Sequence, residues 1–404
     1  MKANMRPLLI YQAPFDWDAL WNRAQPLARE LSAHVDVLYL GCHIRVDTKL
    51  GTIISKIPKI RGFVANALSW WSIKNINKSL NVLTWQSSVS RPGYLYYNDH
   101  GMFTYYLFKK WIKNYCKGRN NLWLLTSKPN AQGLINMLPW TRIGVDVEDP
   151  WLDWDWDQIN DKKRDLLSEN IKVLFKRASF ITSNGEKMAD SMKHLTNKDI
   201  FNISNGIDDT TLDKMIELQN SRSKNKKNDE ELRIVYVGSV DKRINYKLLN
   251  DVAIGFPMCR IFLVGPINES MGNQQKNWEY FKTNPNVTIA GPVEYSEVPF
   301  ILSNSNVLII PYNREIGVIN MLPSKVLEYI SSGNPVVSTI DYGIKNDDAP
   351  NYICDNTENI VPLIRQALDY AYSESNNCYE KIIKHIETKK WSAIANKFLK
   401  NFRN

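Results

Sequence analysis

The chain has 404 residues, enough for two or three domains that each bury a core of their own. Its apolar share of 44% and charged share of 23% are ordinary for a globular protein, which excludes a disordered, collagen-like or coiled-coil chain. The net charge of +9 is uneven, because residues 50–120 hold eleven basic residues and one acid, Asp99, while the rest is nearly neutral. The five cysteines and five histidines form no CxxC or HxxxH pair, so no metal site is expected.

The N-terminus, MKANMRPLLIYQAPFDW, contains a short apolar run that leads directly into an expected strand. A signal peptide has a longer apolar core and a small-residue cleavage site, so none is expected. No window approaches the ~20 apolar residues of a membrane span. The sequence therefore predicts a cytoplasmic protein, with peripheral contact to the inner face of the plasma membrane left open.

Short apolar strands alternate with amphipathic helices along both halves of the chain. In the first half the expected strands are 7–12, 35–40, 122–126, 142–147 and 179–183, with a helix over 19–31. In the second half they are 233–237, 260–264, 287–290, 307–311 and 335–339. This alternation predicts parallel sheets covered by helices on both faces. The polar segment 218–231 is expected to be a linker or loop, and 378–402 is expected to be helical.

The strongest local motif is LPSKVLEYISSGNPVVST, residues 322–339. Pro323 and Ser324 suit a helix start, where free N–H groups and the helix dipole attract a phosphate. Lys325 adds a positive charge at the same end, and Glu328, one turn later, is able to accept hydrogen bonds from a ribose. An ordinary amphipathic helix that leads into a strand explains the pattern equally well.

A second motif, VGSVDKRINYK, covers residues 237–247. Gly238 ends a strand, and Lys242, Arg243 and Lys247 follow it, which suits a diphosphate at the carboxyl edge of a parallel sheet. A solvated basic turn is the alternative, and it is the better interpretation for Lys242. The absence of GxGxxG and GxxxxGK[ST] weakens dinucleotide-oxidoreductase and P-loop interpretations.

Several segments in a fixed order resemble the nucleotide-sugar half of a GT-B glycosyltransferase. They are NGID (205–208), YVGSVD (236–241), FLVGP (262–266), the segment 286–312 and PSKVLEYISSGNPVVST (323–339). The set is similar to family 4-like enzymes of bacterial cell-surface polysaccharide assembly and, in PSKVLEY, to xanthan-type glucuronosyltransferases. The first half matches more weakly, through its opening strand, VDVED and RASFITSN.

The resemblance implies an α/β architecture with two Rossmann-like domains whose parallel sheets face a central cleft. Residues 1–205 would bind the acceptor, residues 206–377 would bind the nucleotide-sugar donor, and the helix 378–404 would return toward the first domain. No metal and no cofactor are expected, because helix dipole and basic side chains stabilise the leaving nucleoside diphosphate. A UDP-sugar is the first choice of donor.

The same resemblance assigns roles to residues of the second half. The diphosphate would lie near Gly238 and Ser239, be neutralised by Arg243 or Lys247, and be cradled by Ser324 and Lys325. Glu328 would hold the ribose, and the backbone of Pro292 and Val293 would meet the nucleobase.

One position departs from the family pattern and bears on the stereochemistry. Retaining members place a Glu with seven residues between it and the ribose Glu; here that position is Asn320, and the nearest upstream acid is Glu315. Inversion is therefore slightly favoured, and it needs a carboxylate base from the first domain.

The segment GVDVEDPWLDWDWD, residues 144–157, provides acids at the carboxyl edge of an expected strand. Asp149 is the first choice of base, and Asp16 and Asp18 are the alternatives. A structural role, as a helix N-cap or as a solvated acid in a turn, is an equally good interpretation of Asp149. It is the better one for Glu148, Asp153, Asp155 and Asp157.

The cationic segment 50–120 combines basic residues with Trp and Phe. These include Lys59, Arg61, Trp70, Trp71, Phe108, Lys109, Lys110, Trp111 and Lys113. Such pairing suits an anionic membrane surface. A pair of helices with core aromatics and solvated lysines is an equal alternative, and nucleic-acid binding is a weaker one. The resemblance favours the membrane, because the acceptor in polysaccharide assembly is often a lipid-linked sugar.

The expected partners are thus a nucleotide-sugar, a saccharide or lipid-linked saccharide acceptor and an anionic membrane surface, without nucleic acid. Two other functions remain open for this architecture. One is a sugar-nucleotide epimerase of GT-B-like fold, and the other is a non-catalytic binding module.

Overall fold

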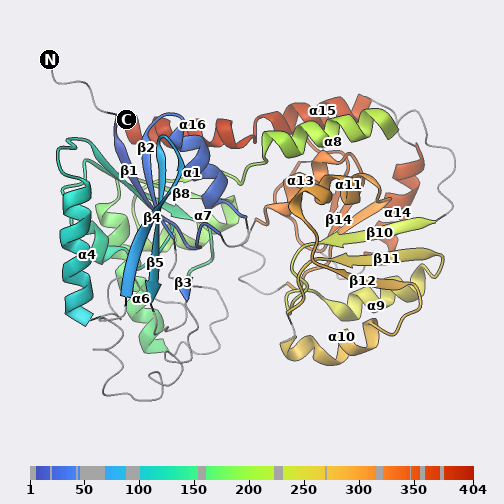
Figure 1. The fold of residues 1–404 in the computed structure, drawn as a ribbon. Coiled ribbons are helices and arrows are strands. Elements are labelled where there is room, and N and C mark those ends of the chain that lie inside the picture. Colours follow the sequence, from blue (N-terminus) through green and yellow to red (C-terminus); the bar gives the residue numbers. More distant parts are fainter. Residues whose placement is uncertain are drawn as a thin grey trace. The chain divides into compact units, whose positions relative to one another are not determined.

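The computed structural model describes residues 6–18, 21–41, 44–45, 69–87, 101–152, 161–222, 231–268, 271–314, 322–345, 347–354, 360–373 and 377–404. It consists of two compact units, each with its own sheet (Figure 1). The first comprises Met1–Ile203 and Ser392–Asn404, and the second comprises Ser204–Trp391. The division after Ile203 lies two residues before the boundary expected from the sequence.

The first unit is built on a mostly parallel sheet with the strand order β3-β5-β2-β1-β6-β7-β8-β9, and β4 pairs with β5 in antiparallel orientation. The strands are β1 (Leu8–Gln12), β2 (Asp36–Leu40), β3 (Ile44–Arg45), β4 (Ser69–Asn77), β5 (Leu80–Ser87), β6 (Leu122–Thr126), β7 (Arg142–Val147), β8 (Phe180–Ser183) and β9 (Ile200–Asn202). All five strands expected here are present. Trp70 and Trp71 lie on β4, so the interpretation of that segment as a helix is wrong.

Helices cover both faces of this sheet. They are α1 (Ala24–Ser32), α4 (Gly101–Tyr115), α5 (Gln132–Ile135), α6 (Asp161–Arg177), α7 (Glu186–Met192) and α16 (Trp391–Arg403), with a short 3-10 turn η1 (Lys193–Leu195). Residues of α4, α5, α6 and α7 share one core with alternate strand positions such as Leu124 and Val145. On the opposite face Phe402 of α16 stacks on Trp123 and meets the edge of Phe180, each with ring centroids 4.8 Å apart.

The second unit has a six-stranded, entirely parallel sheet with the order β12-β11-β10-β13-β14-β15. The strands are β10 (Leu232–Val237), β11 (Cys259–Val264), β12 (Val287–Gly291), β13 (Val307–Ile310), β14 (Val336–Ser338) and β15 (Tyr352–Cys354). The sequence predicted the first five, within one or two residues at each end. Buried apolar residues run along both faces of these strands, as in a sheet covered on both sides.

The helices of the second unit form two groups on either side of its sheet (Figure 1). They are α8 (Asp209–Arg222), α9 (Tyr246–Gly255), α10 (Gln275–Phe281), α11 (Val298–Ser303), α13 (Lys325–Ser331), α14 (Ile360–Ser373) and α15 (Asn377–Glu387), with 3-10 turns η2 (Gly272–Gln274) and η3 (Tyr295–Glu297). Helix α9 contacts α10 and α14, whereas α8 contacts α11 and α13. Residues 218–222 belong to α8, so the expected linker 218–231 is helical where it begins.

The C-terminal stretch expected to be one helix forms two. Helix α15 belongs to the second unit, and Ser392–Asn404 of α16 belong to the first. The helix α16 packs on the first unit through Phe398 and Phe402, which alternate with its exposed lysines.

Candidate functional site

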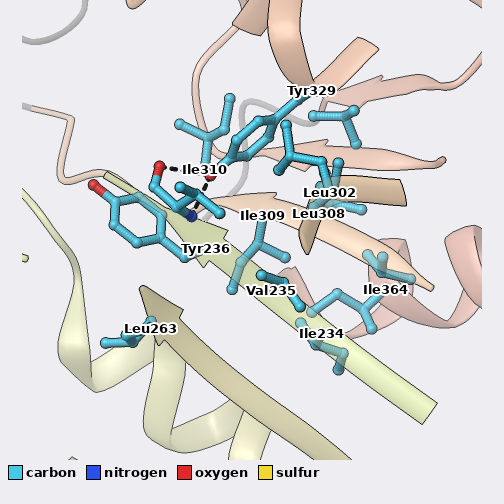
Figure 2. Close-up of a cluster of buried hydrophobic side chains, with 14 of the residues drawn as sticks. Ile234, Val235, Tyr236, Leu263, Leu302, Leu308, Ile309, Ile310, Tyr329 and Ile364 are labelled. Carbon is cyan, nitrogen blue, oxygen red and sulfur yellow. Dashed lines mark hydrogen bonds between the residues drawn. The ribbon is translucent and has the colours of Figure 1, made fainter. Parts of the chain in front are cut away.

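Helix α13, which carries Lys325 and Glu328, is fixed to the carboxyl end of β10. The hydroxyl of Tyr329 accepts a hydrogen bond from the N–H of Val237 at 2.5 Å and donates one to its carbonyl at 2.9 Å. Figure 2 shows Tyr329 directed at the end of this strand from the cluster of buried apolar side chains. A buried tyrosine with both bonds satisfied is costly to displace, so the first turn of α13 is held beside β10.

The ammonium of Lys325 occupies the space beside Gly238. Its Nζ donates to the hydroxyl of Tyr236 at 2.8 Å and lies 4.0 Å from the centre of that ring and 5.4 Å from the ring of Tyr312. Gly238 has φ +143°, and a Cβ there would overlap this ammonium. Burial lowers the pKa of Lys325 below its ordinary value, while Tyr312 opposes the shift.

Two buried phenols support this lysine. Tyr236 donates to the carbonyl of Ser239 at 2.8 Å, and its oxygen lies 3.2 Å from the hydroxyl of Tyr312. Both side chains are almost completely buried. The carbonyl of Ser239 thus takes part in a fixed network at the strand end, where ligands of parallel sheets bind.

The other predicted cations of the donor site differ in their surroundings. Arg243 binds Asp241 with two parallel bonds, Nε to Oδ1 at 2.9 Å and Nη2 to Oδ2 at 2.6 Å. Burial is the largest single influence on its pKa and lowers it, but the hydrogen bond and charge of Asp241 together with Tyr312 and Tyr236 outweigh burial, so the pKa is raised. Lys247 is exposed on the first turn of α9, and the exposed Ser324 makes no capping bond at the start of α13. Lys325 is therefore the predicted cation that lies closest to Gly238.

Glu328 has a tyrosine partner that the sequence did not suggest. The hydroxyl of Tyr295 donates to Oε1 of Glu328 at 2.6 Å. Burial raises the pKa of Glu328 and the neighbouring Asp208 acts in the same direction, whereas the Tyr295 bond and Lys325 lower it. The exposed Pro292 and half-buried Val293 come just before Tyr295 in the chain. A tyrosine in such a loop gives no signal in a single sequence, so its role emerges only from the fold.

In the first unit the acids of GVDVED have three different environments. Asp146 is fully buried and forms an ion pair with Arg23, Nε to Oδ2 at 2.8 Å. Arg23 also donates to the carbonyl of Ile203, and Thr182 donates to Oδ1 of Asp146 at 2.7 Å. Asp146 is therefore a structural residue. Asp149, the predicted base, is half-buried just beyond the carboxyl end of β7.

Glu148 is buried, so its interpretation as an N-cap or solvated turn acid is wrong. It is 7% exposed, and among the described residues its Oε1 has no hydrogen-bond partner. Burial, with Asp146 and Asp149 nearby, raises its pKa to about 8. Asp153, Asp155 and Asp157 lie outside the described residues.

The alternative acids Asp16 and Asp18 follow β1. Asp18 forms an exposed ion pair with Lys74 at 2.7 Å. Asp16 is half-buried, and burial raises its pKa to about 6, with Lys128 lowering it and Asp18 raising it. These two acids and Asp149 follow strands that are neighbours or next neighbours in one parallel sheet, so they share its carboxyl edge.

The cationic segment is only partly described. Lys59 and Arg61 lie outside the described residues, as do the side chains of Trp70 and Trp71. On α4, Lys109 is half-buried and Lys110 and Lys113 are exposed. Phe108 is buried in the core and Trp111 packs against it. The aromatics described on α4 therefore serve the core, and its lysines form the surface.

Two kinds of feature are absent from the described part of the chain. It contains no group of three or more His, Cys, Asp or Glu side chains that could hold a metal ion. None of its helices is both long enough and apolar enough to cross a membrane. A cavity of about 560 Å³ in the second unit is lined by residues of β15 and α14, including Cys354 and Tyr370. None of the predicted donor-binding residues lines it.

Comparison with known proteins identifies the second half most directly. Residues 218–385 match the family Glycosyl transferases group 1. A curated relative is "Putative teichuronic acid biosynthesis glycosyltransferase TuaH" from Bacillus subtilis (strain 168), which is 20% identical over 220 residues. That match covers 52% of this chain and 53% of the Bacillus protein.

Solved structures match over almost the whole chain. The sucrose-phosphate synthase of Thermosynechococcus elongatus has a TM-score of 0.68 at 13% identity, with 98% of both chains covered. HepE of Anabaena, solved in complex with UDP, has a TM-score of 0.60 at 10% identity, with 99% of this chain and 100% of that chain covered. The expected fold is confirmed: the chain has the GT-B fold of these glycosyltransferases, and its residues 218–385 match the group 1 glycosyl transferases, in agreement with the expected enzyme class.

Proposed function

We propose that this protein transfers a sugar from a nucleotide-sugar to a saccharide acceptor during the synthesis of a bacterial surface polysaccharide. The observation that carries the proposal is Lys325, held beside Gly238 at the carboxyl end of β10 within the region that matches the group 1 family. A UDP-sugar is the proposed donor, in line with the UDP held by the Anabaena structure. A lipid-linked saccharide is the proposed acceptor class.

The proposed chemistry places the charge of the leaving group at the start of α13. The acceptor oxygen forms a bond to the anomeric carbon of the sugar while the bond from that carbon to the diphosphate oxygen breaks. The nucleoside diphosphate leaves with the electron pair, and Lys325 and the N–H groups of α13 stabilise its charge. Glu328 accepts hydrogen bonds from the ribose. In this scheme no bound metal takes part.

The proposed base that takes the acceptor proton is Asp149, which makes the transfer inverting. A single displacement with a base needs only that carboxylate and a donor held in place. Asp149 is half-buried at the sheet edge, where a substrate hydroxyl is able to approach it. Asp16 is the second choice, because its carboxyl lies at the same edge.

Docking on an anionic membrane is the proposed route to a lipid-linked acceptor. Lys110 and Lys113 are exposed at helical spacing on one side of α4, and Lys117 is exposed just beyond the end of that helix. Each lysine near an anionic surface contributes about 1 kcal/mol to binding. Because Phe108 and Trp111 pack on the core, this proposal rests on charge and not on inserted aromatics.

The donor is tested by thermal unfolding with a panel of UDP-, GDP-, dTDP- and CMP-sugars. A ligand that binds the folded state at a hundred times its Kd adds about 2.7 kcal/mol of stability. We expect a UDP-sugar to raise the midpoint in the wild type and not in Lys325→Met. No response to any of the nucleotide-sugars would contradict the proposal.

The two alternative functions give different results in the same system. Epimerisation of the donor without any acceptor would favour the epimerase. Donor binding without turnover, in the presence of membranes that contain the acceptor, would favour the binding module. Transfer of label from the donor to a lipid fraction supports the glycosyltransferase.

A further inference from the structure

Tyr295 differs from the other tyrosines that surround the donor-site helix. Tyr236 and Tyr329 are completely buried and bond to the end of β10. Tyr295 is 40% exposed, yet its hydroxyl reaches Oε1 of Glu328 at 2.6 Å. A side chain that serves only the core has little reason to leave so much of its ring at the surface while its polar end is fixed.

Three chain segments meet at this hydroxyl. Tyr295 begins η3, directly after the turn that follows β12, and Glu328 lies in the first turn of α13. Thr211, in the first turn of α8, lowers the pKa of Tyr295, and Asp208, just before α8, raises it. Burial is the largest cause of that raised pKa, and Glu328 is the next. Tyr295 therefore remains a neutral phenol whose O–H group donates a hydrogen bond to Glu328.

The bond decides which part of Glu328 is open to a ligand. Among the described residues, Tyr295 is the hydrogen-bond partner of the Glu328 side chain, through Oε1. A carboxylate held at one oxygen by a short, charge-assisted bond cannot rotate freely, so Oε2 keeps one direction. Without this bond, Glu328 is expected to adopt several orientations and to be repelled by Asp208, which also raises its pKa.

From this arrangement we infer that Tyr295 is a positioning residue, which orients Glu328 to read the ribose hydroxyls of the donor nucleotide. The inference rests on the proposed function, since it needs Glu328 to bind a ribose. It adds a residue to the donor site and a consequence for specificity. Tyr295 is the reason that the site distinguishes a nucleotide with both ribose hydroxyls from a deoxy analogue.

The test compares the binding of UDP, 2′-deoxy-UDP and 3′-deoxy-UDP by calorimetry in the wild type and in Tyr295→Phe. We expect the wild type to prefer UDP over at least one analogue by about tenfold, the size of one hydrogen bond to a charged group. In Tyr295→Phe the preference is expected to fall to about twofold or less. Affinity for the analogue should change little, because it lacks the hydroxyl that Glu328 reads.

The pH dependence of UDP binding gives a second readout, which would not change if Tyr295 had only a structural role. The groups that face Glu328 are Tyr295, Lys325 and Asp208, and the Tyr295 bond is one that lowers its pKa. Removing the phenol should therefore move the pH midpoint of UDP binding upward, so that affinity is lost at a higher pH on acidification. In a Glu328→Gln background, Tyr295→Phe should have no further effect on binding or on the midpoint.

Tyr280→Phe is the matched control, since Tyr280 is an exposed tyrosine of the same unit, on α10. It should leave the ribose preference unchanged. A Tyr295→Phe variant that keeps both the full preference and the wild-type midpoint would overturn the inference. A wild type that binds UDP and both deoxy analogues equally well would also overturn the inference. A wild type that binds neither UDP nor any nucleotide-sugar of the panel would instead remove the proposed function itself.

Discussion

The ammonium of Lys325 fills the space that a side chain at Gly238 would take. A Cβ built on Gly238 would overlap Nζ and lie 2.9 Å from Cε of Lys325. The glycine also has φ +143°, which favours glycine over other residues. The two motifs found separately in the sequence, VGSVDKRINYK and PSKVLEY, are thus parts of one site, in which the glycine of one makes room for the lysine of the other.

Gly238→Ala is predicted to displace Lys325 and to weaken nucleotide binding. The new methyl group cannot share the space with the ammonium, and the backbone at φ +143° is strained for alanine. We expect UDP affinity to fall by about tenfold or more, the size of one charge-assisted hydrogen bond, and stability to fall by about 1 kcal/mol or more. Calorimetry with UDP and urea unfolding measure the two effects.

Gly255→Ala serves as the control for that variant. Gly255 ends α9, and the nearest atom to a Cβ there is a Val361 methyl at 3.5 Å, which is ordinary contact. This change should leave UDP affinity unaltered. If Gly238→Ala bound UDP as tightly as Gly255→Ala, the close approach of Lys325 to position 238 would have no bearing on the donor.

The buried pair of Arg23 and Asp146 is predicted to be a major source of stability in the first unit. Asp146→Asn removes the charge that balances Arg23, whose side chain is only 3% exposed. Removing one partner of a buried ion pair costs about 3–5 kcal/mol, because the other charge stays buried. Urea unfolding of the purified variant measures this loss.

Asp18→Asn is the matched control, because Asp18 and Lys74 form an ion pair of similar length at the surface, with 62% and 51% of their side chains exposed. Exposed pairs contribute less than about 1 kcal/mol. If Asp18→Asn and Asp146→Asn lowered the unfolding free energy by similar amounts, burial would not make the Arg23–Asp146 pair more important for stability than the exposed pair.

Much of the fold could be predicted because the strands are short apolar runs between polar segments. Strands β6 and β7 have the predicted bounds, since all five residues of β6 and five of six in β7 are buried. Strand β4 was missed, because its Lys and Asn residues conceal the alternation and its partner β5 follows after only two residues. Tertiary pairing, rather than local pattern, makes β4 a strand.

The sequence predicted those site residues that belong to a recognisable motif. It did not predict those residues whose role depends on neighbours that only the fold brings close. Gly238 and Lys325 stand in recognisable motifs, and the structure brings them together. Glu148 reads as a solvated acid beside Asp149, and only the packing around β7 reveals that it is buried. Tyr295 lies 33 residues before Glu328, and a single sequence contains no sign of that contact.

Asp149→Asn is predicted to retain donor binding and to lose turnover. The amide has nearly the same shape but cannot take the acceptor proton, so turnover should fall by about a hundredfold or more. UDP release in the presence of membranes that contain the acceptor measures turnover, and calorimetry measures UDP binding. Asp165→Asn, an exposed acid on α6 of the same unit, is the control. Near-normal turnover in Asp149→Asn would exclude Asp149 as the base.

Charge reversal on α4 is predicted to weaken binding to anionic vesicles. Lys110→Glu together with Lys113→Glu changes the charge of this exposed side by four, and lysines near an anionic surface each contribute about 1 kcal/mol. Sedimentation with and without anionic lipid measures the bound fraction. Lys397→Glu with Lys400→Glu, on the exposed side of α16 in the same unit, is the control. Equal loss in both double variants would indicate that net charge, not α4, binds the vesicles.

Glu148 is expected to make stability depend on pH in the neutral range. Its side chain is 7% exposed, and burial with Asp146 and Asp149 nearby raises its pKa from about 4.5 to about 8. The folded state therefore keeps a proton that the unfolded chain loses above pH 4.5. A raised pKa means that this contribution to stability is fully present below pH 4.5 and is lost as the pH rises to 8.

Glu148→Gln removes this titration and is predicted to gain stability over the wild type as the pH rises. The neutral amide needs no proton, so the difference in unfolding free energy should grow between pH 5 and pH 8, by an amount on the order of a few kcal/mol. Urea unfolding at several pH values measures it. Glu186→Gln, at an exposed position on α7, should follow the wild-type curve. If the unfolding free energies of Glu148→Gln and Glu186→Gln changed with pH in the same way, Glu148 would have to be ionised in the folded protein at neutral pH, with a partner for its charge.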